Sequence, residues 1–115
     1  MTADCLFCAI VAGHVHADVV HRDDDALAFR DISPQAPVHV LVIPTVHAAT
    51  AAELAERDPA LAGRLLGVAA DIARAEGVED SGYRIVTNTG PHAGQSVHHV
   101  HFHVLGGRDL AWPPG

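Results

Sequence analysis

Residues 99–105 decide the fold, and they read His99-Val100-His101-Phe102-His103-Val104-Leu105. In a β-strand, residues at i, i+2 and i+4 project from the same face about 6–7 Å apart, whereas on a helix this spacing scatters them around the axis. The alternation therefore predicts a strand within residues 97–105 that lines up three imidazoles on one face and apolar residues on the other. Histidine is also unusually frequent in the whole chain, with 10 copies in 115 residues against 7 of Lys and Arg together.

The segments around this strand predict an α+β domain with a mainly antiparallel sheet, spanning residues 1–115. Apolar residues at helical spacing follow Asp58 and Pro59, an N-cap and a first-turn proline, and continue to Gly77. This pattern predicts one long amphipathic helix. The other expected elements are a short helix from Cys5 toward Val11 capped by Asp4, and strands at residues 17–21, 26–31, 38–43 and 83–87.

Charge and composition exclude several classes of function. The formal net charge is −7, which disfavours binding to a nucleic-acid backbone, and no lysine is present, which excludes a P-loop lysine, a Schiff-base lysine and a polybasic membrane patch. The first residues resemble no signal peptide, and no apolar run approaches the roughly 18 residues of a membrane span. We therefore expect a cytoplasmic protein that binds neither nucleic acid nor membrane.

The two cysteines of the chain form the pair Cys5-x-x-Cys8. A redox pair, half of a zinc site and two inert thiols all fit this spacing. A thioredoxin-like site would follow a strand in a βαβ unit, and no strand is predicted before Cys5, which argues against redox chemistry. A tetrahedral zinc would need two further ligands, which histidines could supply.

The strand and its surroundings resemble the histidine-triad (HIT) family, whose signature alternates histidines with apolar residues as residues 99–105 do. Within this family, the surrounding sequence resembles the Hint branch in particular. The match covers nearly the whole chain and implies a five-stranded, mainly antiparallel sheet with one long and one short helix, and a homodimer that joins two such sheets. The further matching segments are Asp31-Ile32-Ser33-Pro34-Gln35-Ala36-Pro37, Gly94-Gln95-Ser96, Gly106-Gly107 and Trp112-Pro113-Pro114-Gly115.

The resemblance implies a hydrolase or transferase that acts on purine nucleoside 5′-phosphoramidates, such as derivatives of AMP or GMP. His101 matches the nucleophile, and a neutral imidazole can attack phosphorus to give a covalent nucleotidyl-histidine that water hydrolyses, so the chemistry requires no cofactor. His103, His39 and His99 are expected to complete the catalytic group by binding phosphate oxygens or orienting His101. The resemblance places the remaining nucleotide contacts at Asp31, Ile32, Asn88, Gly94, Gln95 and Ser96, with Ser96 beside the leaving group.

The resemblance also implies a structural zinc. Bacterial members often hold one with two cysteines, a histidine just past a Pro-x-x-His segment and the first histidine of the triad. Here these residues are Cys5, Cys8, His47 and His99.

One departure from the family pattern concerns the turn before Gln95. Many Hint-like sequences have two glycines there, whereas this chain has Ala93-Gly94, and alanine resists positive φ. Of the remaining histidines, His98 is expected to stand beside the site without acting in it. His14, His16, His21 and His92 are expected at the surface.

Other readings stay open at this point. His99, His101 and His103 could bind a catalytic zinc with an open position, as in metal-dependent hydrolases. A dinucleoside polyphosphate hydrolase of the same family and a non-catalytic purine nucleotide-binding module also fit. Without the family match, Asp31 and Asn88 would be turn residues and His39 a buried core histidine.

Overall fold

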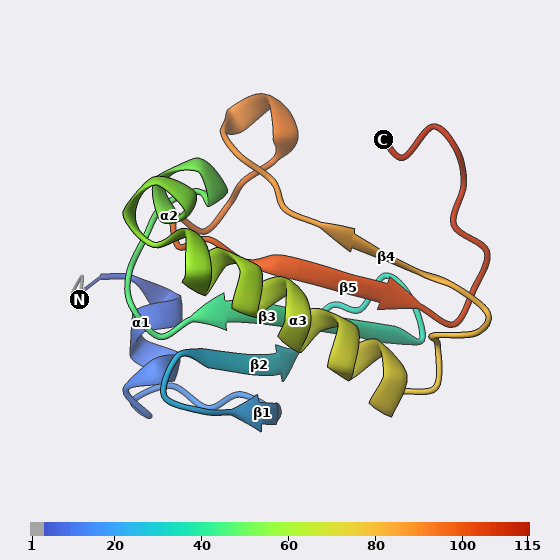
Figure 1. Ribbon diagram of the computed structural model, residues 1–115, viewed down its shortest axis with the longest axis horizontal. Helices are drawn as coiled ribbons and strands as arrows, with labels where there is room; N and C mark the ends of the chain where they lie inside the picture. Colours follow the sequence, from blue (N-terminus) through green and yellow to red (C-terminus); the bar gives the residue numbers. More distant parts are fainter. Residues whose placement is uncertain (1–3) are drawn as a thin grey trace.

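A single antiparallel sheet of five strands organises the molecule (Figure 1). The structure, a computed structural model, describes residues 4–115. The strands lie in the order β1 (Val19–Arg22), β2 (Ala26–Arg30), β3 (Val38–Pro44), β5 (Phe102–Gly106) and β4 (Tyr83–Val86), and each pair of neighbours is antiparallel. The prediction of an α+β fold with a five-stranded, mainly antiparallel sheet is thus confirmed.

The long helix α3 (Pro59–Ala75) covers one face of the sheet (Figure 1). It begins as predicted, because the Asp58 carboxylate accepts a hydrogen bond from the backbone N–H of Leu61 at 3.0 Å and Pro59 opens the first turn. Its apolar stripe buries side chains against the central strands. The core on this face includes Leu61, Leu65, Val68 and Ile72 from the helix with Val40, Val42 and Val104 from the sheet.

A second helix, α2 (Ala51–Arg57), lies just before α3 and was not predicted. Its start is a capping box: the Thr50 hydroxyl accepts from the N–H of Glu53 at 3.1 Å, and the Glu53 carboxylate accepts from the N–H of Ala49 at 2.7 Å. The Thr-x-x-Glu spacing at residues 50–53 is the signal that would have indicated this helix.

The short helix α1 (Leu6–Val11) packs on the opposite face of the sheet. The prediction that Asp4 caps it is wrong: Cys5 is the N-cap, and its sulfur accepts from the N–H of Cys8 at 3.3 Å. A thiol takes the place of the expected carboxylate, and the same Cys5 sulfur also lies 3.5 Å from His99 Nδ1. The core on this face joins Phe7 and Ile10 with Leu27, Phe29, Leu41 and Ile43.

The histidine-rich strand is shorter than predicted, since β5 begins at Phe102 rather than Val97. The alternation nevertheless continues through the irregular segment before it. Val100 joins the core under α3, while the rings of His99 and His101 pack edge-on against Phe7 on the other face. The sequence pattern therefore placed the side chains correctly even where the regular hydrogen-bond ladder is absent.

The loop between β4 and β5 contains a short 3-10 helix, η1 (Pro91–Ala93), flanked by Gly90 with φ 83° and Gly94 with φ 77°. Ala93 lies inside η1, so the positive φ falls on the glycines and not on the alanine. The departure from the family pattern is thus accommodated. None of the helices in the part of the chain that is described is long and apolar enough to span a membrane.

Candidate active site and metal centre

A cavity of about 350 Å³ opens on the face of the sheet that carries α1. Its walls are largely apolar, and its polar groups come from His16, from the end of β2 and from the segment 96–103. The cavity brings together Asp31, Ile32, Ser96, His101 and His103, which the sequence predicted as site residues. The apolar lining includes Leu6, Phe7, Ile10, Phe29, Leu41 and Val97.

His101 is buried and lines this cavity, and one of its two ring nitrogens is engaged in a hydrogen bond. Its Nδ1 lies 2.8 Å from the backbone carbonyl oxygen of His99, and a carbonyl can only accept, so Nδ1 carries the proton. The neutral ring then leaves Nε2 unprotonated, with a lone pair available to attack an electrophile. This is the protonation state that a nucleophilic imidazole requires.

His103 and His39 form a pair whose proton positions also follow from their partners. The N–H of Gln35 donates to His39 Nδ1 at 3.0 Å, so His39 carries its proton on Nε2, which lies 2.9 Å from His103 Nδ1. His103 accepts that bond and keeps its own proton on Nε2. The chain of bonds therefore turns His103 into a fixed N–H donor beside His101, with ring centroids 5.1 Å apart.

Burial keeps this pair uncharged. Burial, helped by the nearby His101 and His39, lowers the pKa of His103 to about 4, and the Asp31 carboxylate opposes this effect. Burial likewise lowers the pKa of His39 below its ordinary value. The two rings therefore act as neutral hydrogen-bonding groups at pH 7 rather than as fixed cations.

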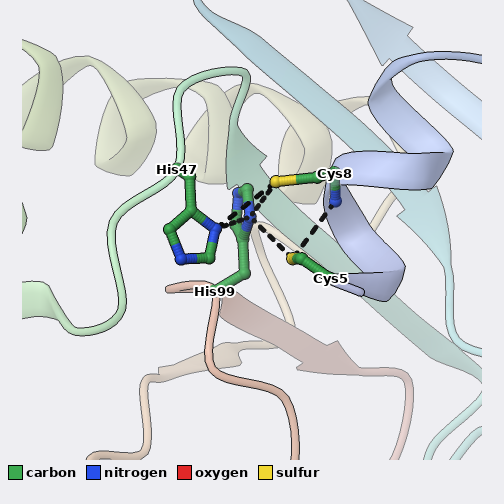
Figure 2. A group of neighbouring side chains, drawn as sticks. All are labelled: Cys5, Cys8, His47 and His99. Carbon is green, nitrogen blue, oxygen red and sulfur yellow. Dashed lines mark hydrogen bonds between the residues drawn. The ribbon is translucent and has the colours of Figure 1, made fainter. Parts of the chain in front are cut away.

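A second cluster lies at the start of α1 and is formed by Cys5, Cys8, His47 and His99 (Figure 2). The Nδ1 atoms of His47 and His99 are 3.3 Å apart, and His99 Nδ1 lies 3.5 Å from the Cys5 sulfur. The Cys8 sulfur lies 3.4 Å from His47 Nδ1 and 3.6 Å from His99 Nδ1. Tetrahedral zinc bonds of about 2.0–2.3 Å separate ligand atoms by about 3.3–3.8 Å, so the donor set fits this metal.

The tautomer of His99 supports the same interpretation. Its Nε2 donates to the carbonyl oxygen of Pro44 at 3.0 Å, which leaves Nδ1 with a lone pair directed at the two sulfurs. Burial lowers the pKa of His99, and its ring is fully buried. Burial raises the pKa of the Cys5 thiol, an effect that a bound divalent cation would oppose by favouring the thiolate.

The alternative of a catalytic zinc held by the three triad histidines is wrong for this arrangement. His99 turns its free nitrogen toward the cysteines, and His101 uses Nδ1 within its own segment. Asp31, His39 and His103 also lie close enough together to suggest a metal group. There, however, His39 Nε2 carries a proton directed at His103, so the two imidazoles form a hydrogen-bond relay, with the Asp31 carboxylate 3.5 Å from His39 Nε2.

Two of the predicted nucleotide contacts have other partners in the structure. The Gln95 side chain is buried and bonds the backbone of Gly90, Ala49 and Val97, so it braces the loop. The N–H groups of Gly94 and Gln95 donate to Pro91 and Gly90. Asn88 is half-buried and does not line the cavity. A phosphate role for these residues therefore stays a prediction.

Several residues that matter to the site were missed from the sequence. Phe7 and Ile10 form the wall of the cavity, a role indicated only by their apolar spacing on the helix. Nothing in the sequence indicated the Gln35 N–H, because its contact with His39 depends on the folded loop. His16, expected at the surface, is exposed but lines the cavity mouth, and His21 pairs with Asp23 at 2.7 Å.

Comparisons with known proteins agree with this geometry. The model of the HIT domain family matches residues 12–110. The chain belongs to the HIT family. A purine nucleoside phosphoramidase of Escherichia coli is 47% identical over 111 residues, covering 96% of this chain and 92% of that protein, which fits the Hint-like branch of the HIT family.

Two further HIT relatives bear on the fold and the metal. A crystal structure of a HIT family hydrolase from Legionella pneumophila superposes with a TM-score of 0.94 at 48% identity, covering 97% of this chain and all of that one. A 14 kDa zinc-binding protein of Zea mays is 48% identical over 112 residues, covering 96% of this chain and 87% of that protein.

Proposed function

We propose that this HIT protein hydrolyses purine nucleoside 5′-phosphoramidates, compounds in which an amine is joined to the phosphate of AMP or GMP. The observation that carries the proposal is the His101 ring, which is buried beside the cavity with Nδ1 bound to the His99 carbonyl. In the neutral tautomer that this bond selects, Nε2 is unprotonated, as a nucleophile must be. The naming of the E. coli relative as a purine nucleoside phosphoramidase supports the substrate class.

In the proposed reaction, His101 Nε2 attacks the phosphorus atom. A bond from Nε2 to phosphorus forms while the phosphorus–nitrogen bond to the leaving amine breaks, and the amine departs after taking up a proton from solvent, which the attacking water of the second step returns. Water then attacks the nucleotidyl-histidine, which releases the nucleoside monophosphate and restores His101. His103 donates from Nε2 to a phosphate oxygen, and Ser96 lies in the same cavity near the leaving group.

The apolar cavity suits the purine and ribose. Phe29, Leu41 and Ile10 would offer apolar contacts to the base, and Asp31, which lines the same cavity, would accept hydrogen bonds from the ribose hydroxyls. Asp31 already caps its own turn, because its carboxylate accepts from the N–H of Ser33 at 2.8 Å. One carboxylate oxygen therefore fixes the side chain, and the other, which lies 3.5 Å from His39 Nε2, would be shared between this ring and the ligand.

We also propose that Cys5, Cys8, His47 and His99 hold a structural zinc ion. Zinc there would be four-coordinate with protein ligands, so it would supply folding energy and no reactive water. Both cysteines are free thiols in the structure, as a cytoplasmic location would maintain them.

The central experiment compares the parent protein with His101→Ala on adenosine 5′-phosphoramidate. We expect kcat to fall by about 10⁶-fold, the scale seen when a covalent nucleophile is removed from an enzyme, while AMP binding persists. His98→Ala is the matched control, because His98 is an exposed neighbour in the same segment. Parental kcat in His101→Ala would rule out this nucleophile, and intact-mass detection of a nucleotidyl adduct would identify the intermediate.

A further inference from the structure

The helix α1 stands between the two sites described above. Its first residues carry the cysteines of the metal cluster, and the Cys5 sulfur is also its N-cap. Its buried face, Phe7 and Ile10, forms a wall of the nucleotide cavity. One short element thus belongs both to the proposed zinc site and to the proposed purine site.

This helix depends on external contacts for its position. It has six residues, and isolated helices shorter than about 12–15 residues are marginal in water, so tertiary contacts must hold it. On its apolar side, Phe7 packs edge-on against Phe29 with ring centroids 5.4 Å apart and against His101 at 5.1 Å. At its start, the thiols of Cys5 and Cys8 meet His47 and His99 of the main body.

We propose that zinc in the Cys5–Cys8–His47–His99 cluster sets the affinity of the cavity for purine nucleotides by holding α1, and with it Phe7 and Ile10, against the sheet. The inference rests on the proposed function for its ligand. When the cluster is empty, two thiols and two imidazoles retain only weak mutual contacts, and α1 loses its main polar anchor. The purine then loses one wall of its pocket.

Zinc removal should disturb the histidines of the proposed reaction less than it disturbs the purine-binding part of the cavity. The N–H of Val100 donates to the carbonyl of Ala48 at 2.7 Å, which fixes the backbone around His99 independently of α1. The His39–His103 bond lies on β3 and β5, within the sheet. Zinc removal is therefore expected to raise KM and the AMP dissociation constant more than it lowers kcat, a separation that general loss of folding would not produce.

Coupling of this kind is reciprocal. If zinc tightens AMP binding by a given factor, AMP must tighten zinc binding by the same factor. The second quantity can be measured with a competing chelator and without any turnover, so the proposal can be tested apart from enzyme activity.

The first test measures AMP binding by calorimetry on the zinc-loaded protein and after chelation, at a temperature where circular dichroism shows the fold intact. We expect chelation to weaken AMP binding by about tenfold, within the usual range of coupling between sites. The matched control is Leu65→Ala on α3, which opens a cavity in the core on the opposite face of the sheet. That variant is destabilised but keeps the parental AMP affinity and its dependence on zinc.

The second test asks whether Phe7 transmits the effect of zinc to the nucleotide cavity. Phe7→Leu keeps all four metal ligands and should bind zinc as the parent does, yet chelation should change its AMP affinity much less than tenfold. Equal AMP affinity of the parent with and without zinc would overturn the inference, as would failure of the parent to bind zinc. Zinc-dependent AMP binding without phosphoramidate cleavage would instead overturn the proposed function and leave the coupling standing.

Discussion

At the scale of single residues, three histidines of one segment acquire different chemistry from the bond each makes at one nitrogen. A carbonyl at Nδ1 directs the free lone pair of a neutral His101 to Nε2, as the proposed nucleophile requires, and a carbonyl at Nε2 directs that of His99 to Nδ1, as the proposed metal ligand requires. His103 accepts at Nδ1 from His39 and becomes a donor. The sequence predicts that the three rings share a face, but their roles follow from partners that only the fold brings together.

Gly107 provides a residue-scale prediction about stability. Its φ is +90°, and a Cβ added there would lie 2.9 Å from the Cβ of Pro37, a contact with ring atoms that cannot move freely. Gly107→Ala is therefore expected to lower the free energy of unfolding by about 1–3 kcal/mol, from strained backbone and crowding together. Urea unfolding followed by circular dichroism measures the change.

The matched control for this prediction is Gly67→Ala. Gly67 is exposed on α3 with open space around the added Cβ, and alanine favours a helix interior over glycine by about 0.8–1.0 kcal/mol. Gly67→Ala should thus be stabilising. If Gly107→Ala unfolded at the same urea concentration as the parent, the close approach of Pro37 would play no part in stability.

At the scale of elements, the hairpin between β1 and β2 is held by a charged group. Asp23 accepts from the N–H groups of Asp25 and Ala26, both at 2.8 Å, and pairs with His21. The hydrogen bond from His21, followed by those from the backbone, lowers the pKa of Asp23 to about 2. The ionised carboxylate therefore stabilises the folded hairpin.

A pH dependence follows from this shift. Because the folded pKa lies below the unfolded value of about 3.9, the contribution of Asp23 is complete above about pH 4 and is lost as the pH falls toward about 2. We expect Asp23→Asn to be less stable than the parent at pH 7, with the difference shrinking steadily below pH 4. Denaturant unfolding at several pH values measures this, and Asp80→Asn on an exposed turn is the control. A difference that did not vary with pH would show that the charge is irrelevant.

The elements also show what could be predicted from the sequence and what could not. The start of α3 and the strand β3 were predicted because capping residues and apolar runs are local signals. The prediction for the N-cap of α1 is wrong because the Cys5 sulfur also contacts His99, which lies 94 positions away in the sequence and leaves no local signal. The cavity wall at Phe7 escaped prediction for the same reason: packing across the sheet has no local signature.

At the scale of the whole molecule, the larger apolar core and the proposed sites lie on opposite faces of the sheet. The face under α3 is an apolar core, whereas the opposite face holds the cavity, the histidine relay and the thiol cluster. The zinc proposal and the nucleotide proposal therefore concern the same side, while most of the buried aliphatic side chains lie on the other. Substitutions under α3 should change stability without changing ligand specificity.

The last prediction concerns assembly. The family resemblance implies a homodimer, and within residues 4–115 β4 is an edge strand that pairs with β5 alone. Beside it, the exposed Trp112 and the terminal residues border a hollow on β4, and the Arg84 guanidinium bonds the carbonyl of Ala111 at 3.0 Å. An open edge with an exposed aromatic residue is a surface that pairing with a second chain would cover.

We expect light scattering after size exclusion to give twice the chain mass of 12.1 kDa at micromolar concentration. Trp112→Ala should weaken the dimer, His14→Ala at a distant exposed site should not, and a parent protein that stays monomeric would contradict the prediction.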